Sequence, residues 1–345
     1  MRCKPILRWV LCLCAVFWMS LLSLMVAQGT QDEEDVFLAD AAYTPYIYVI
    51  SPKKGASYDG AASLTVKAAG EHVRSIELEL TGEEGTQRFR LDAEEVEHTF
   101  TFGKPQTKGA SLIIRGYGIP DSNGKQHFAE LRQEIPSPKE ELVEKMIALA
   151  YANSKDSRYR FALAETDWDI GVCKNFVMRL FDTFAKDYRM LEYPELALHM
   201  PVNNSKKACA PYDYGIEWKP EGPETGNPFE IAAQFKYNTD LSESDNAALA
   251  RQLLVHIRKG DFFQIVGYYG GGNGPHSMYI IADYDPATEM IRWTDSNMRG
   301  TRIDGVRWGY LQYDADAPVD WWIDVFNRKW RGATLYRLRD DLYHY

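Results

Sequence analysis

The chain has 345 residues, enough for about two domains, and 45% of them are hydrophobic, as in globular proteins. It carries 49 acidic against 39 basic residues, which gives a formal net charge of -10. A negatively charged surface repels polyanions, so nucleic acid is not expected as a partner.

Residues 1–29 have the pattern of a secretory signal peptide. Basic residues precede an apolar run from Trp9 to Ala27, and Ala27-Gln28-Gly29 offers a cleavage site of small residues. The run is close to the roughly 20 residues that cross a bilayer, so an uncleaved anchor is the alternative. We therefore predict a secreted or cell-envelope protein that meets the membrane only through this segment if it stays uncleaved. A linker at residues 30–44 follows.

Only two cysteines, Cys173 and Cys209, remain after such a cleavage. Disulfides persist outside the cytosol, but two cysteines are too few for a disulfide framework. The two thiols either form one bridge, or one of them is reactive. The residues around each cysteine distinguish between these alternatives.

Short strands separated by turns are predicted for residues 45–136. Apolar residues alternate in this segment, as at Ile76, Leu78 and Leu80, and glycines separate the runs. This spacing favours a small all-β sandwich that resembles bacterial immunoglobulin-like modules, with a spacer or binding role. The expected strands are Tyr46–Ile50, Leu64–Ala68, Ile76–Leu80, Phe89–Leu91, His98–Phe102, Leu112–Gly116 and Phe128–Ile135.

A second domain is predicted for residues 137–345, because Pro136-Ser137-Pro138 cannot continue a central strand. Helical spacing then predicts helices at Lys139–Ala152, at about Cys173–Asp187 and up to Lys259. Strands are expected at Phe262–Val266, Ser277–Asp283, Met290–Thr294 and Thr334–Leu338. Helices followed by an antiparallel sheet indicate an α+β domain.

Residues at about 190–240 are expected to form an insertion in this domain. They are rich in Pro, Asn, Gly and Tyr, and their apolar residues show little periodicity. The insertion lies between two candidate catalytic elements, so a lid over the site is the hypothesis for it.

Cys173 is the candidate nucleophile. Gly171 and Val172 precede it, and the apolar stripe of the second predicted helix follows it. A cysteine at a helix N-terminus is activated by the exposed backbone N–H groups and the helix dipole. The alternative is that Cys173 is only the first buried residue of that stripe.

His276 is the candidate base, because it alone among the histidines follows a glycine-rich loop, at residues 270–274, and opens an apolar strand. The next predicted strand ends in Asp295-Ser296-Asn297. Either Asp295 or Asn297 would orient the imidazole, as in the Cys-His-Asn and Cys-His-Asp variants of the catalytic triad.

The order of these motifs resembles that of the CHAP and NlpC/P60 families of papain-like cysteine hydrolases. Gly171-x-Cys173, then Lys259-Gly260-Asp261, then His276, then Asp295-x-Asn297 occur in the CHAP order. The resemblance implies a papain-like α+β fold, with Cys173 as nucleophile, His276 as base, Asp295 as orienter and Asn297 as a second polar residue. It also implies cleavage of amide bonds in peptidoglycan, by an amidase or endopeptidase, through an acyl-enzyme.

No cofactor and no metal ion are predicted, because no histidines or cysteines stand at the spacing of metal ligands. Two other functions remain open. One is an inactive surface-binding or adhesion protein in which Cys173 and Cys209 form a structural bridge. The other is a cysteine protease that acts on proteins instead of peptidoglycan.

Overall fold

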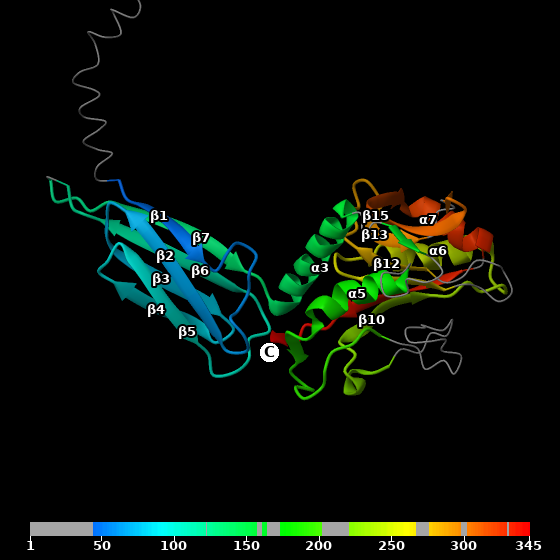
Figure 1. The fold of residues 1–345 in the computed structure, drawn as a ribbon, viewed down its shortest axis with the longest axis horizontal. Helices are drawn as coiled ribbons and strands as arrows, with labels where there is room; N and C mark the ends of the chain where they lie inside the picture. Colours follow the sequence, from blue (N-terminus) through cyan, green and yellow to red (C-terminus); the bar gives the residue numbers. More distant parts are fainter. Residues whose placement is uncertain are drawn as a thin grey trace, which may run out of the picture.

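A computed structural model describes residues 44–121, 123–156, 161–163, 173–201, 221–266, 276–297, 302–329 and 331–345. These residues form two lobes (Figure 1). We call residues 44–136 the sandwich lobe and residues 137–345 the C-terminal lobe. The signal peptide predicted at 1–29 and the linker up to residue 43 lie outside the described residues.

The sandwich lobe consists of two antiparallel sheets that enclose one core. The sheet orders are β1-β2-β5 and β4-β3-β6-β7. Alternate side chains of each strand point inward, and Leu64, Ile76 and Leu112 are fully buried between the sheets. All seven predicted strands are confirmed, with bounds β1 Tyr46–Ser51, β2 Ser63–Glu71, β3 Val73–Gly82, β4 Gly85–Leu91, β5 Glu95–Thr101, β6 Ala110–Gly118 and β7 Phe128–Ile135.

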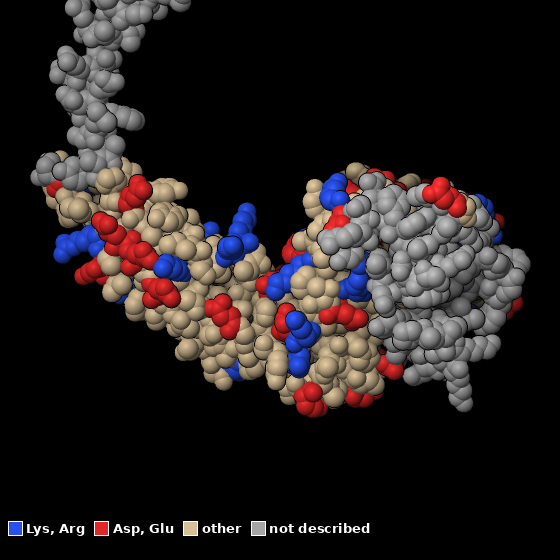
Figure 2. Space-filling view, viewed as in Figure 1, with Lys and Arg blue, Asp and Glu red and all other residues tan. Residues whose placement is uncertain are grey.

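Charges of both signs are interspersed on the surface of the sandwich lobe (Figure 2). On the four-stranded sheet, Arg115 forms ion pairs with Glu77, Glu79 and Glu130. These cross-strand ion pairs lie on the solvent-exposed face of the sheet and pair each acidic side chain with a basic one. They do not create a surface of a single sign.

Helix α3 (Pro138–Lys155) begins immediately after the sandwich lobe. Ser137 caps it: its Oγ accepts the Glu140 N–H at 3.2 Å, and Glu140 Oε2 accepts the Ser137 N–H at 2.8 Å. This reciprocal capping box satisfies two backbone donors that a helix start leaves open. The proline at the first helical position is also favourable, since no N–H is needed there.

The C-terminal lobe is built on an eight-stranded antiparallel sheet in the order β10-β16-β11-β12-β13-β15-β14, with β8 paired to β15. Two further strands, β9 and β17, form a separate pair. The bounds are β8 Phe161–Leu163, β9 Tyr188–Met190, β10 Phe229–Phe235, β11 Phe262–Val266, β12 His276–Ile280, β13 Met290–Asn297, β14 Arg302–Ile303, β15 Val306–Pro318, β16 Gly332–Leu338 and β17 Leu342–His344.

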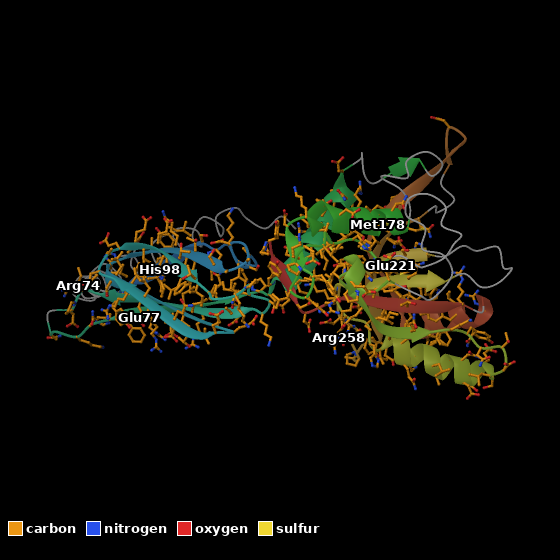
Figure 3. All side chains as sticks on the ribbon, turned by 90° about the horizontal axis from the view of Figure 1, so that it is seen from below. Arg74, Glu77, His98, Met178, Glu221 and Arg258 are labelled. Carbon is orange, nitrogen blue, oxygen red and sulfur yellow. The ribbon has the colours of Figure 1, made fainter. Side chains whose placement is uncertain are left out.

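Helices cover both faces of this sheet. Helices α3 and α5 (Lys174–Ala185) share one core with Phe262 of β11, whereas α6 (Glu243–Leu254) and α7 (Val319–Lys329) share a second core with Phe263. Consecutive residues of β11 are therefore buried on opposite faces. In Figure 3, Met178 of α5 and Arg258 lie in this lobe, far from Arg74, Glu77 and His98 of the sandwich lobe.

The predicted fold class, a papain-like α+β domain behind an immunoglobulin-like sandwich, is wrong. Strands make up 42% and helices 22% of the structure, in several antiparallel sheets, so the chain is mainly β and a papain-like fold is not shown. The helices do not precede the sheet either, since α7 follows β15 and leads into β16. Strands such as β15 escaped prediction because its Asp314, Asp316 and Pro318 disfavour strands in isolation.

The third predicted helix also differs, since α6 ends at Leu254 and not at Lys259. The three N–H groups after Leu254 still donate to backbone carbonyls. Carboxylates then accept the next two, since the Arg258 N–H donates to Asp261 and the Lys259 N–H to Asp283. The segment expected to be an irregular insertion contains β10, which belongs to the main sheet, while its residues 202–220 lie outside the described residues. No helix in the described ranges is long and apolar enough to span a bilayer.

Candidate active site

Cys173 lies at the turn that opens α5, as its N-terminal cap residue. Its backbone has φ 54° and ψ -115°, a region that a residue with a Cβ adopts only when its surroundings impose it. Buried Phe176, Val177 and Leu180 anchor the helix behind it. The Cys173 N–H donates to the Ser296 carbonyl at 2.5 Å, which fixes this turn against β13. The thiol is free and half-buried.

His276 is the first residue of β12 and faces that thiol. Its Nδ1 lies 3.1 Å from Cys173 Sγ, within the reach of a sulfur hydrogen bond. Its Nε2 lies 3.0 Å from Asp295 Oδ2. The imidazole therefore bridges thiol and carboxylate, and each of its nitrogens has one partner.

Asp295 contacts His276 because β12 and β13 are antiparallel neighbours, so the first residue of β12 lies beside the last residues of β13. Only 3% of Asp295 is exposed, so its carboxylate is held away from solvent. Oδ2 also accepts a hydrogen bond from the indole of Trp293 at 3.1 Å. Two donors thus converge on one carboxylate oxygen.

A β-bulge lies beside Asp295. Trp293 pairs with Ala315 and Asp295 with Gln312, so between these pairs β13 advances two residues while β15 advances three. Asp314 adopts φ 59° within the extra stretch. Bulges redirect side chains next to functional sites.

The pKa of His276 departs strongly from its usual value. Burial of the ring lowers the pKa, but the hydrogen bond to Asp295 and the bond and charge of Cys173 outweigh burial and raise it to about 9. The imidazole is therefore positively charged at neutral pH. A cation at this distance stabilises a thiolate.

The structure brings together three of the four predicted site residues, Cys173, His276 and Asp295. Asn297 lies two residues beyond Asp295 on β13 and pairs with Tyr310 of β15. Both ring nitrogens of His276 are engaged by other groups, so in this arrangement Asp295 orients the ring and Asn297 does not. Cys209 and the glycine-rich loop at 270–274 lie outside the described residues.

Two contributions to the site were missed by sequence reasoning. The Trp293 side chain had a signal, because it stands two positions before Asp295 on one strand and therefore on the same face. Most buried indole N–H groups have an acceptor, and for Trp293 it is Asp295. The Ser296 carbonyl had no signal, since a backbone acceptor is the same at every residue.

Asp261, from the Lys259-Gly260-Asp261 motif, has a structural role. Its buried carboxylate accepts two hydrogen bonds from Arg337, both at 2.8 Å, and one from the Arg258 N–H. These contacts tie the start of β11 to β16. Among the described residues, no group of three or more acidic, histidine or cysteine side chains is arranged to hold a metal ion.

No protein-family model matches the chain, and no curated protein matches it significantly. The chemistry of the site therefore rests on its own geometry.

Proposed function

We propose that this protein is a cysteine hydrolase that cleaves amide bonds through a thioester acyl-enzyme. The observation that carries the proposal is the row formed by the Cys173 thiol, the His276 imidazole and the Asp295 carboxylate, with contacts of 3.1 and 3.0 Å. A nucleophile, a base within hydrogen-bond reach and a group that orients the base are the parts that acyl transfer requires.

The chemical steps follow from these contacts. Cys173 Sγ attacks the carbonyl carbon, the C–N bond breaks, and His276 Nδ1 gives its proton to the leaving amine. Water then attacks the thioester carbon while His276 takes one of its protons. The C–S bond breaks, and the thiolate beside the imidazolium is restored. Asp295 keeps the ring aligned and balances its charge throughout.

The Cys173 N–H is not available to stabilise the oxyanion, so another donor is required. The Cys173 N–H, the donor expected from its place at a helix start, is already bonded to the Ser296 carbonyl. In sharp nucleophile turns the residue after the nucleophile supplies a backbone donor. We assign this role to the N–H of Lys174, the first residue of α5.

Peptidoglycan is the substrate class we propose. Its support is the order of motifs around Cys173, His276 and Asp295, which resembles that of the CHAP family, and the signal-peptide pattern of residues 1–29. The fold adds nothing to this choice. The stem peptides of peptidoglycan contain the amide bonds that the proposed chemistry cleaves.

The test is digestion of purified peptidoglycan and muropeptides by the full chain, with mass analysis of the products. Cys173→Ala and His276→Ala are each expected to abolish hydrolysis and to keep the wild-type circular dichroism spectrum, because the pair acts as a unit. Turnover by either variant at the wild-type rate would exclude the mechanism.

Substrate class is decided in parallel on denatured proteins. Cleavage of proteins without release of muropeptide fragments would change the substrate and keep the chemistry. Iodoacetamide labelling of Cys173 tests the binding-protein alternative, since a Cys173–Cys209 bridge would block alkylation until reduction.

A further inference from the structure

One oxygen atom of the proposed site serves two donors. Asp295 Oδ2 accepts from His276 Nε2 at 3.0 Å and from Trp293 Nε1 at 3.1 Å. The two carboxylate neighbours differ in kind: the imidazole exchanges protons in the proposed reaction, whereas an indole N–H does not titrate. Both bonds persist through the cycle, because the proton is exchanged at His276 Nδ1, but only the indole donor keeps the same charge state throughout.

The Trp293 ring is held by packing on the face of the sheet covered by α6 and α7. Only 7% of it is exposed, and it meets the Trp322 ring edge to face at 5.1 Å. Trp322 packs in turn on Phe263 and Phe326. This aromatic cluster fixes the direction of the indole N–H, because a close-packed ring cannot turn without opening a void.

We propose that Trp293 is a positioning residue, whose indole N–H fixes Asp295 Oδ2 so that His276 Nδ1 points at Cys173 Sγ. The inference rests on the proposed function for its catalytic meaning. Without the indole bond, Asp295 Oδ2 loses one of the two donors that hold it in line with His276. The imidazole would then be held less firmly in its alignment and beside the charge that balances it.

The test compares Trp293→Phe with a matched control, Trp322→Phe, in the full chain. Both variants remove the same volume from one aromatic cluster. Trp322 Nε1 is buried without a hydrogen-bond partner in the described part of the chain, so its loss removes packing alone. The readouts are the His276 titration by NMR of the imidazole, the alkylation rate of Cys173 by iodoacetamide, and kcat and KM on muropeptides.

Trp293→Phe is expected to lower the pKa of His276 by about one unit, from about 9 toward its usual value, and to slow alkylation at neutral pH. It should lower kcat about tenfold with KM changed less than about twofold. Trp322→Phe should lower the pKa of His276 less than Trp293→Phe does, because it loosens the packing around the indole but keeps the N–H that donates to Asp295. Equal titration curves for the two variants would overturn the proposal.

If Trp293→Phe fails to fold, benzothienylalanine at position 293 keeps the shape of the indole and replaces its N–H by sulfur. The same titration then decides. Absence of hydrolysis by the wild-type chain would count against the proposed function only, because the NMR titration of His276 does not depend on turnover.

Discussion

The site concentrates its charges on three side chains in a line, with the imidazole in the middle. The pKa of His276 rises despite burial because the ring is hydrogen-bonded to Asp295 on one side and to Cys173 on the other. Because its pKa of about 9 exceeds the usual 6.5, the imidazolium is present below about pH 9 and is lost above it. Hydrolysis that uses this proton should decline in the same range.

Asp295→Asn should move the alkaline decline of the reaction. The amide carries no charge, so the pKa of His276 falls toward 6.5 and the decline shifts to lower pH. We expect a loss of kcat of at least about 100-fold, and a much smaller loss for Asn297→Ala. Rate profiles between pH 6 and 10 on one muropeptide measure both effects. If kcat falls further in Asn297→Ala than in Asp295→Asn, the side chain that orients His276 is Asn297 and not Asp295.

The oxyanion donor can be read from amide signals when a peptide aldehyde forms a thiohemiacetal with Cys173. In ¹⁵N-labelled protein, the Lys174 amide proton should move downfield, while the Cys173 amide, which donates to Ser296, should stay in place. A shift of the Cys173 amide with an unmoved Lys174 would assign the donor to the nucleophile itself. Mass analysis confirms the adduct independently.

At the scale of elements, strand β13 organises the site. It supplies the Asp295 carboxylate, the Trp293 indole and the Ser296 carbonyl that holds the Cys173 turn. The bulge opposite it lies on β15, where the Thr294 hydroxyl donates to the Gln312 carbonyl. A change in the bulge should therefore shift the position of the Asp295 side chain.

Asp314→Val should disturb that bulge. A β-branched residue at φ 59° costs roughly 1–3 kcal/mol, whereas Asp314→Gly keeps the backbone conformation. Both variants lose the paired hydrogen bonds from Arg292, so the difference between them isolates the backbone. The free energy of unfolding in urea and kcat should both fall more for Asp314→Val than for Asp314→Gly. Equal values for the two variants would show that the bulge does not control the site.

The sequence predicted the strands of the sandwich lobe because one face of each is solvated, which leaves a period of two, as at Ile76, Leu78 and Leu80. The main sheet of the C-terminal lobe is buried on both faces, so Phe262 and Phe263 show no such period. The strands predicted there are nevertheless confirmed as β11, β12, β13 and β16. The triad was predictable from order along the chain. The Ser296 contact was not, since it depends on the register between a turn and a strand.

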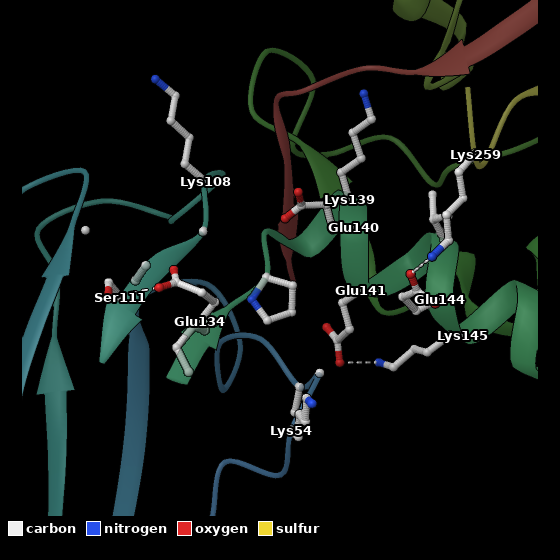
Figure 4. Close-up of a pocket in the computed structure, with 18 of the residues that line it drawn as sticks. Lys54, Lys108, Ser111, Glu134, Lys139, Glu140, Glu141, Glu144, Lys145 and Lys259 are labelled. Atoms are coloured by element: carbon white, nitrogen blue, oxygen red, sulfur yellow. Dashed lines mark hydrogen bonds and ion pairs between the residues drawn. The ribbon is translucent and has the colours of Figure 1, made fainter. Parts of the chain in front are cut away.

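At the scale of the molecule, the two lobes meet far from the thiol. Cys173 is at the start of α5, and Tyr188, at the junction with the sandwich lobe, follows its end. A 12-residue helix spans about 18 Å. The cleft between the lobes has a volume of about 1590 Å³ and is lined by charged side chains of both signs (Figure 4). The described part of the sandwich lobe therefore lies away from the Cys173 thiol.

One buried carboxylate joins the lobes. Glu141 of α3 accepts hydrogen bonds from Ser57 of the sandwich lobe at 2.9 Å, from Tyr188 at 3.3 Å and from His344, and pairs with Lys145 at 3.0 Å. Burial raises its pKa, but the bonds from His344 and Lys145 outweigh burial and lower the pKa to about 2. The ionised form is therefore strongly favoured in the folded chain.

Glu141→Gln should destabilise the C-terminal lobe in a pH-dependent way. Because the folded pKa lies below the usual 4.5, the contribution of the carboxylate is full above about pH 4.5 and disappears as the pH falls through about 2. In guanidinium unfolding, the free energy of unfolding of Glu141→Gln should lie far below that of the wild type at pH 7. The difference should shrink at pH 2.5. Ser57→Ala is the control, since it removes one neutral donor and should cost about 1 kcal/mol at both pH values. A deficit for Glu141→Gln that is equal at pH 7 and pH 2.5 would mean that the carboxylate joins the lobes by shape alone, and that its charge contributes nothing to holding them.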